Sequence, residues 1–461
     1  MSPRMWLPVC AALALTGCST YRPAELAAAP QFPADIPDVT LGRPERPFPA
    51  LDLHPFDARD GLDVTEVAML AVVNNPDLRA ARAGARITAA QSFSAGLLPE
   101  PQLNLTRDFP DALASGGSSA FVAGVSYAIN ALITHATTVE AGRQDRRQTD
   151  LNVLWQEWQV IAQARLLFVR LQAAAQRRDL LQRTDALLGD RYRRTRQALA
   201  AGLLTLDVVT PQFVALQDVE RQLHDLDRQA NQARFDLIAL LGLAPGTTVA
   251  LQGEAAFAPL DAGAIRARLP ALLERRPDLQ ALRAGYAAQD ARYRVALLGQ
   301  FPALTLGVQR SRDTSNVYSR GFGITLGLPL FNRNRGEIRV QDATRDKLRA
   351  EYQQRLNTAD TDIERVLAEQ RISLRQLDDI DAALDTLHSA GDRMRAAFAA
   401  RNADALTLAT LEIATLAKES ERIDARQAIQ EQRIGMLTLT GGTAFGAVPA
   451  TPDPAQGVPT P

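Results

Sequence analysis

The chain has 461 residues, of which 46% are hydrophobic and only 5% are aromatic, and its formal net charge at pH 7 is −1. That length is enough to bury a substantial core, and the balanced charge argues against nucleic acid as a partner. Abundant Ala, Leu, Arg, Gln and Asp with few aromatic residues favours long helices that meet along narrow seams of small side chains.

The first residues have the pattern of a secretory signal. Arg4 supplies a positive charge, and the apolar run Met5–Leu15 behind it is too short to span a membrane. The segment Leu15-Thr16-Gly17-Cys18 resembles a bacterial lipobox, in which the chain is cut before a cysteine that becomes acylated. We expect a signal peptide over residues 1–17 and a covalent lipid on Cys18, with Ser19 favouring the outer membrane. The alternative is an ordinary signal peptide with an incidental cysteine.

Cysteine and histidine usage gives no sign of a metal or redox site. The two cysteines are Cys10, which leaves with the signal, and Cys18, which would carry the lipid. A disulfide and a cysteine metal site are therefore both excluded. No histidine has a partner at metal-ligand spacing, and no glycine-containing stretch has the lysine of a phosphate loop. We expect no metal, no other cofactor and no enzymatic activity; the histidines are His54, His135, His224 and His388.

The body of the chain contains two copies of one unit. The stretch Pro76-Asp77-Leu78 returns as Pro277-Asp278-Leu279, and residues 76–105 match residues 277–306 at 13 of 30 positions without a gap. A repeat this long is a duplicated module rather than a short solenoid unit. We therefore divide the chain into a lipid-anchored linker (18–61), a first repeat (62–261), a second repeat (262–442) and a disordered Pro-rich tail (443–461).

Each copy predicts the same order of helices. The predicted ranges are 63–98, 136–200 and 206–241 in the first copy, and 262–300, 335–400 and 405–440 in the second. Proline is absent from Asp111 to Thr210 and from Leu330 to Val448, which permits very long helices. Apolar residues step by three and four as in a coiled coil, although Arg165 interrupts the first stripe; the stripes are Leu151, Leu154, Trp158, Ile161, Phe168 and Leu171, then Leu377, Ile380, Leu384 and Leu387.

Two short strands in each copy alternate with a period of two. Leu103 and Leu105 in the first strand alternate with polar residues, and the same pattern recurs around residues 121–129, 304–309 and 322–328. One apolar face and one small or polar face is typical of a membrane barrel. The loops Asp111–Ser118 and Asp313–Tyr318 would face outside. Four strands cannot close a barrel, so the chain must assemble. Three chains would give twelve strands and four would give sixteen, and the strand count alone does not choose.

These pieces resemble the TolC-type outer-membrane efflux factors, in particular the lipoprotein branch that serves resistance-nodulation-division pumps. The resemblance covers about residues 62–442. It is carried by Asn75-Pro76-Asp77-Leu78, by Arg276-Pro277-Asp278-Leu279, by Leu97-Leu98-Pro99-Glu100-Pro101, and by the stretch from Leu328 to Gly336 between a strand and a long helix. The first copy lacks that Pro-Leu-Phe stretch and has Tyr127-Ala128-Ile129 in its place.

The resemblance implies a mainly α fold with a membrane β-barrel contribution. Each chain would supply long coiled-coil-like helices and two β-hairpins, and a homotrimer would close a twelve-strand barrel above an α-helical tunnel in the periplasm. Partners would be a periplasmic adaptor, an inner-membrane pump of the resistance-nodulation-division type and outer-membrane lipid. The function implied is a passive exit duct for drugs or metal ions. The alternatives are the exit duct of a type I protein secretion system and a periplasmic coiled-coil adaptor lipoprotein without a pore.

The resemblance also implies where partners would bind. In related ducts the tips of the helical hairpins contact the adaptor, and acidic residues near the tips surround the aperture. We expect Asp404 and Asp207 at the aperture, with helix N-terminal charge as the alternative role of both carboxylates. The residues expected to contact the adaptor are Gly202, Leu203, Leu204 and Thr205 at the first tip, and Arg401 and Asn402 at the second. From the sequence of the first tip, we expect Gly202 to end one helix and Thr205 to cap the next. At the second tip Asn402 takes the place of the glycine, since asparagine also tolerates a left-handed turn.

Overall fold

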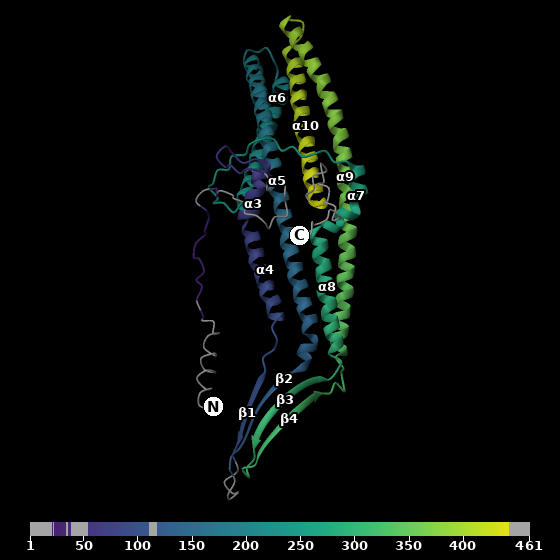
Figure 1. The fold of residues 1–461 in the computed structure, drawn as a ribbon. Coiled ribbons are helices and arrows are strands. Elements are labelled where there is room, and N and C mark those ends of the chain that lie inside the picture. Colours follow the sequence, from purple (N-terminus) through teal and green to yellow (C-terminus); the bar gives the residue numbers. More distant parts are fainter. Residues whose placement is uncertain (1–20, 22, 34–35, 38–53, 110–117, 442–461) are drawn as a thin grey trace, which may run out of the picture.

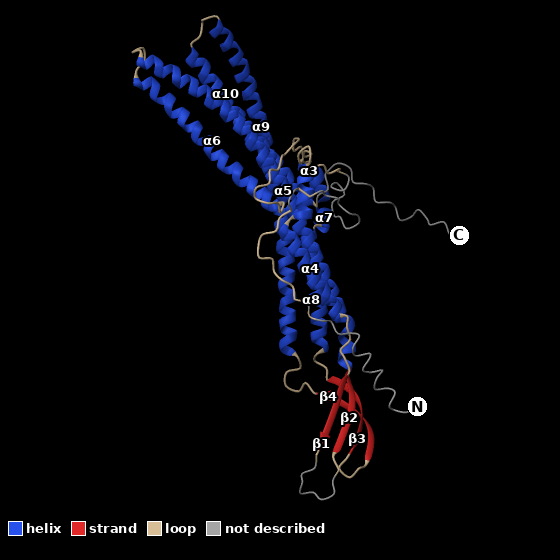
Figure 2. Ribbon diagram, turned by 90° about the vertical axis from the view of Figure 1, so that its left-hand side faces the viewer, coloured by secondary structure: helices blue, strands red, loops and turns tan. Residues whose placement is uncertain are grey.

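The computed structural model describes residues 21, 23–33, 36–37, 54–109 and 118–441. The molecule is elongated, with a small sheet at one end and the tips of two helical hairpins at the other (Figures 1 and 2). The mainly helical fold is therefore as predicted. The predicted signal peptide, Cys18, the Pro-rich tail and most of the loop Asp111–Ser118 lie outside the described residues.

The two copies share one order of elements. In the first copy these are α3 (Val64–Asn74), α4 (Pro76–Ala95), β1 (Gln102–Asp108), β2 (Ala120–Ala128), α5 (Ile129–Ala200) and α6 (Leu206–Leu240). In the second they are α7 (Ala262–Arg275), α8 (Pro277–Leu298), β3 (Ala303–Arg312), β4 (Tyr318–Gly327), α9 (Arg335–Ala399) and α10 (Ala405–Thr440). α5 is 72 residues long, about 110 Å at 1.5 Å per residue.

The first predicted helix of each copy, 63–98 and 262–300, is wrong as a single helix. Each is divided at its Pro-Asp-Leu motif, where the proline lacks the N–H of a helical hydrogen bond and the residue before it lies outside the helical region. Asn75 accordingly has φ −56° and ψ 127°, and Arg276 has φ −64° and ψ 124°. In both copies the proline becomes the first residue of the next helix, where its missing N–H costs nothing.

The residue before the proline is buried in both copies but acts differently. Asn75 accepts a hydrogen bond from Leu78 N at 2.9 Å and donates one to Leu240 O at 2.8 Å. Arg276 instead donates two hydrogen bonds to the Asp278 carboxylate, at 3.0 and 2.8 Å, and lies over the Trp155 ring at 5.2 Å. The same motif is thus a helix cap in one copy and a buried ion pair in the other.

The long helices pack along the predicted apolar stripes. Ile380 and Leu384 are buried between α9 and α10 against Ala425, and Leu181 and Leu226 are among the residues buried between α5 and α6. A larger core gathers α3, the middle of α5 and the end of α6. Arg165, which interrupts the α5 stripe, lies 5.8 Å from the centre of the Phe257 ring, and burial lowers its pKa to about 10. The guanidinium therefore remains charged at neutral pH.

The four strands form a single antiparallel sheet in the order β1-β2-β3-β4. β2 pairs with β3, from Phe121 opposite Arg312 to Ala128 opposite Thr305, so the two predicted hairpins are joined into one surface. This pairing links the two copies directly at that end of the molecule. Among the described residues, no helix combines the length and the apolar character needed to cross a membrane.

The two copies leave the sheet by different routes. β2 ends at Ala128 and α5 begins at Ile129, so the helix starts seven residues before the predicted Ala136, and Ile129 is helical rather than part of the strand. The segment Tyr127–Ala131 contains neither glycine nor proline to break the chain there. β4 instead leads into a corner in which Arg333 and Asn334 have φ of 47° and 56°, and α9 starts directly after it.

The buried pair predicts unequal roles for the two copies of the Pro-Asp-Leu motif. Asp278→Asn should lower the free energy of unfolding by about 3–5 kcal/mol, because it leaves the Arg276 guanidinium buried without a counter-charge. The matched control is Asp77→Asn in the first copy, where the carboxylate is exposed and the cost should stay below about 1 kcal/mol. Chemical denaturation followed by circular dichroism measures both, and equal losses would contradict this assignment.

Candidate functional site

The register of the sheet sorts its side chains onto two faces. Residues paired directly across strands lie on the same face, and successive residues point to opposite faces. Leu103 pairs with Val125, Val125 with Val308, and Val308 with Phe322, so one apolar row crosses all four strands. The next row on the other face is Asn104, Gly124, Gln309 and Gly321. The predicted alternation is confirmed in all four strands.

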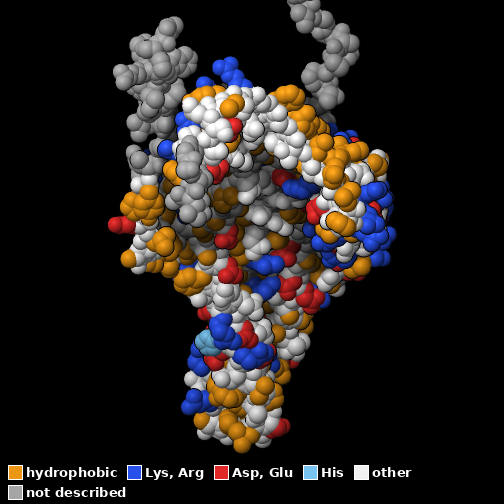
Figure 3. All heavy atoms as spheres, turned by 90° about the horizontal axis from the view of Figure 1, so that it is seen from below, with side chains coloured by type: hydrophobic (Ala, Val, Ile, Leu, Met, Phe, Trp, Pro, Cys, Tyr) orange, Lys and Arg blue, Asp and Glu red, His pale blue; other side chains and the backbone are white. Residues whose placement is uncertain are grey.

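The apolar face is open to its surroundings. Phe322 is 79% exposed, Leu103 67% and Val308 64%, and the leucines and isoleucine of the neighbouring rows are exposed as well. Figure 3 looks from the sheet end and shows hydrophobic side chains around the outside of a hollow whose visible lining is mostly uncharged polar side chains and backbone. An apolar surface of this extent marks contact with another protein or a membrane.

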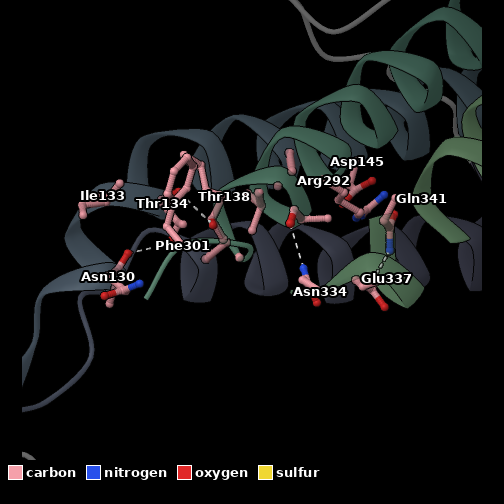
Figure 4. A pocket seen from close by; sticks show the side chains of 18 of the residues that line it. Asn130, Ile133, Thr134, Thr138, Asp145, Arg292, Phe301, Asn334, Glu337 and Gln341 are labelled. Atoms are coloured by element: carbon pink, nitrogen blue, oxygen red, sulfur yellow. Dashed lines mark hydrogen bonds and ion pairs between the residues drawn. The ribbon is translucent and has the colours of Figure 1, made fainter. Parts of the chain in front are cut away.

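A cavity of about 770 Å³ lies where the strands give way to the helices. It lies between the two copies, with α4 and α5 from the first and α8 and the start of α9 from the second (Figure 4). Asn130 closes its sheet end by accepting a hydrogen bond from Leu304 N and donating one to Pro302 O at 3.4 Å. Asn334 donates to Ala296 O at 2.7 Å. These amides fasten the sheet and α9 to neighbouring helices.

An ion pair between Asp145 of α5 and Arg292 of α8 lies at the other end of this cavity (Figure 4). Burial raises the pKa of Asp145, and Arg292 only partly offsets this. The polar groups of this cavity connect neighbouring helices and strands. The pair joins residues 147 positions apart, and no local pattern in the sequence marks it.

The first hairpin tip ends α5 as predicted. Gly202 follows the helix with φ +71°, and Gly202 N and Leu203 N donate to Leu199 O and Ala198 O at 2.9 and 2.8 Å. This is the Schellman arrangement, in which a left-handed residue closes the last turn. Leu203 is 76% exposed and Leu204 is half-buried. Thr205 holds the N-cap position of α6, but its side chain makes no capping hydrogen bond, so that part of the prediction is wrong.

The second tip has the same pattern of hydrogen bonds, but its left-handed residue is an arginine, which the sequence did not reveal. Arg401 N and Asn402 N donate to Phe398 O and Ala397 O at 2.9 and 2.8 Å. The left-handed residue is Arg401, with φ +60°, and not Asn402. The prediction that Asn402 replaces the glycine is therefore wrong by one position. An arginine has a β-carbon that crowds the following carbonyl in this conformation, and Asn would have been the less strained choice.

The two predicted acidic residues lie at the N-terminal ends of the returning helices α6 and α10, which begin at the same end of the molecule (Figure 2). Asp404 is the N-cap of α10 and accepts hydrogen bonds from the backbone N–H and the hydroxyl of Thr407, both at 2.7 Å. These bonds lower the pKa of Asp404. Asp207 is exposed in the first turn of α6. Both carboxylates thus hold positions that a helix N-terminus favours.

One histidine has acidic neighbours that its spacing did not reveal. His54 Nε2 lies 2.8 Å from Asp63 Oδ2, close to Glu66. However, Asp63 and Glu66 form a capping box at the start of α3, and both Glu66 oxygens accept backbone N–H groups at 2.8 Å. The acidic residues therefore already serve the helix terminus, and we describe the group as a cap.

Comparisons with known proteins agree with this geometry. The family model described as outer membrane efflux protein matches residues 269–442. The pyoverdine export outer membrane protein OpmQ of Pseudomonas aeruginosa is 28% identical over 405 residues, which cover 81% of this chain and 83% of that protein. The probable outer membrane lipoprotein SilC of Salmonella typhimurium is 24% identical over 181 residues, covering 37% of this chain and 39% of that protein.

The fold is that of known outer-membrane channels. The structure of the outer-membrane channel OprN superimposes with a TM-score of 0.70 at 17% identity, covering 90% of this chain and 99% of that one. This chain matches the model of the outer membrane efflux protein family over residues 269–442. It is an outer-membrane channel component of an efflux system.

The left-handed residues at the tips predict opposite effects of two substitutions. Arg401→Gly should raise the free energy of unfolding by about 1 kcal/mol, because glycine adopts this conformation without strain. Gly202→Ala should lower it by about the same amount, since a β-carbon there meets no atom within 4 Å and only the backbone is strained. Denaturation midpoints of both variants measure this, and a loss of stability in Arg401→Gly would contradict it.

Proposed function

We propose that three chains close a twelve-stranded barrel and a helical tunnel, and that this homotrimer is the exit duct of a tripartite efflux system. The observation that carries the proposal is the sheet. Its apolar face is exposed, and its outer strands β1 and β4 each pair on one side only within the described chain. Unpaired strand edges are prohibitive in lipid, so β1 of one protomer would pair with β4 of the next.

The helical end would lie in the periplasm and contact a periplasmic adaptor, itself bound to an inner-membrane pump of the resistance-nodulation-division type. The exposed apolar side chains at the tips support this role, since leucines that are 51–76% exposed there offer a partner an apolar surface; they are Leu203, Leu206 and Leu406. The exposed Arg401 has a strained backbone, which is typical of a residue with a functional role. The residues in contact with the adaptor would be Gly202, Leu203, Leu204, Thr205, Arg401 and Asn402.

The duct would be passive, without a cofactor and without catalysis, and would carry drugs or metal ions that the pump delivers. The name of OpmQ points to pyoverdine for that relative. Cys18 would carry a lipid that tethers the chain to the outer membrane, an assignment supported by the lipoprotein name of SilC. The sheet argues against a pore-less adaptor lipoprotein, and the family favours efflux over type I protein secretion.

Neighbouring residues of β4 test which face of the sheet meets lipid. Ile324 lies on the apolar face and Thr325 on the other. Ile324→Arg should destabilise the membrane-inserted barrel by about 2–4 kcal/mol and reduce the amount of trimer in outer-membrane fractions, because a buried charge near the bilayer centre is costly. Thr325→Arg, one residue away, should assemble normally. Equal assembly of both variants would rule out a lipid-facing apolar surface.

Asp404 tests whether the carboxylates act at the aperture or only cap helices. Asp404→Asn keeps an N-cap acceptor but removes the charge, whereas Asp404→Ala removes both. Because its Thr407 hydrogen bonds lower the pKa of Asp404, the carboxylate stays charged below the usual Asp range. Wild-type trimers in planar bilayers should therefore conduct with a preference for cations, and that preference should survive mild acidification.

The expected result is reduced cation preference in Asp404→Asn, with the thermal midpoint unchanged. Asp207→Asn is the matched variant at the first tip and should act in the same direction. Unaltered conductance in Asp404→Asn, together with a lower thermal midpoint in Asp404→Ala alone, would show that Asp404 only caps α10 and does not act at the aperture. A wild-type trimer that never conducts would overturn the duct itself.

A further inference from the structure

Four arginines lie together at one end of the apolar face of the sheet, the end farther from the helices; we call them the arginine band, Arg107, Arg310, Arg312 and Arg320. The register places them in two adjacent rows of that face. Arg310 pairs directly with Arg320, and Arg107 and Arg312 both pair with Phe121. The band therefore lies beyond the apolar rows, next to the loops that connect the strands.

The charges of the band are not neutralised within the sheet. The paired residues of this face include no Asp or Glu, and in the described part of the chain no ion pair joins Arg310 or Arg320 to a carboxylate. Like charges directly opposite on neighbouring strands repel each other. The pairing of Arg310 with Arg320 is therefore unfavourable unless an anion lies between or above the two guanidinium groups.

Three of the four side chains of the band contact uncharged groups. Arg107 and Arg312 both donate to the Ser119 hydroxyl, and Arg312 also donates to Ser119 O at 2.8 Å. Arg310 lies over the Tyr318 ring at 5.7 Å. The Nε of Arg312 is buried and has no hydrogen-bond partner within the described chain. These contacts orient the guanidinium groups but leave donors for an anion.

A shallow hollow of about 590 Å³ connects the band to the apolar rows. Arg310 and Arg320 form its charged end, and Leu103, Val125, Val308 and Phe322 line its apolar part. A ligand that fits both parts has an anionic head and hydrocarbon chains. A guanidinium binds phosphate through two parallel N–H···O bonds, which makes phosphate the preferred head group.

We propose that the arginine band binds the phosphate groups of a lipid in the outer leaflet, with the acyl chains of that lipid lying on the apolar rows. The proposal rests on the proposed function, since it needs the sheet to lie in the membrane with its helical end in the periplasm. Basic clusters at the level of the head groups attract anionic lipids. The lipid phosphate would offset the repulsion between Arg310 and Arg320 and add stability to the barrel at that end.

The test uses the full-length lipidated protein and the double variant Arg310→Gln/Arg320→Gln. The matched control is Arg371→Gln/Arg375→Gln, two exposed arginines of α9 far from the sheet. Binding of diphosphoryl lipid A, and of the same lipid after phosphatase treatment, is measured by native mass spectrometry of detergent-solubilised trimers. We expect the double variant to bind the phosphorylated lipid at least tenfold more weakly, and the control to bind it as the wild type does.

Removing the phosphates should abolish the difference between wild type and double variant, and high salt should reduce it. Equal binding of the phosphorylated lipid by wild type and double variant would overturn the proposal, as would undiminished binding of the dephosphorylated lipid by the wild type. Channel conductance of the same preparations distinguishes failure of the lipid-binding proposal from failure of the proposed duct function. Conducting trimers without phosphate-dependent binding refute the arginine band alone, whereas absence of any conductance refutes the duct on which it rests.

Discussion

The pairing of β2 with β3 is the constraint on which the rest of the arrangement depends. It joins the two copies edge to edge and sets the phase of their side chains, so that Val125 and Val308 share a row. A slip of one residue would turn every side chain of the second copy to the other face. The four strands would then present mixed polar and apolar faces, and the surface would suit neither lipid nor a water-filled passage.

The long helices are held together by apolar side chains packed along narrow seams, rather than by backbone hydrogen bonds as in the sheet. Between α9 and α10 the seam is narrow, with Ile380, Leu384 and Ala425 as its buried residues. Much of each helix surface remains exposed, because a single chain has too few neighbours to cover it. Stability beyond these seams depends on the junction between the copies, where Asn130, Asn334 and the Asp145–Arg292 pair connect strands to helices. In the proposed homotrimer, further copies of the chain would cover the surface that one chain leaves exposed.

Much of this fold could be predicted because its signals are local. The proline-free stretches and apolar steps of three and four predicted the long helices, and the period of two predicted both faces of the sheet. The divided helices were missed although Pro76 and Pro277 were visible, because the apolar pattern runs through them. The burial of Arg276, its pairing with Asp278 and the contact of Asp145 with Arg292 depend on tertiary neighbours, which spacing does not report. At the tips, Asn402 looked suitable for the left-handed position, yet the helix ends one residue earlier and Arg401 takes it.

The two exits from the sheet give the two hairpins of a protomer unequal mechanical freedom. Where β2 passes into α5 without a turn, the helix cannot swivel about its axis unless the strand turns with it, and the strand is held by two ladders of hydrogen bonds. Where β4 reaches α9 through Arg333 and Asn334, a corner separates the two axes, and Asn334 holds the start of α9 against Ala296 of α8. We therefore expect a twist of the sheet to reach the α5–α6 hairpin directly and the α9–α10 hairpin only through this corner.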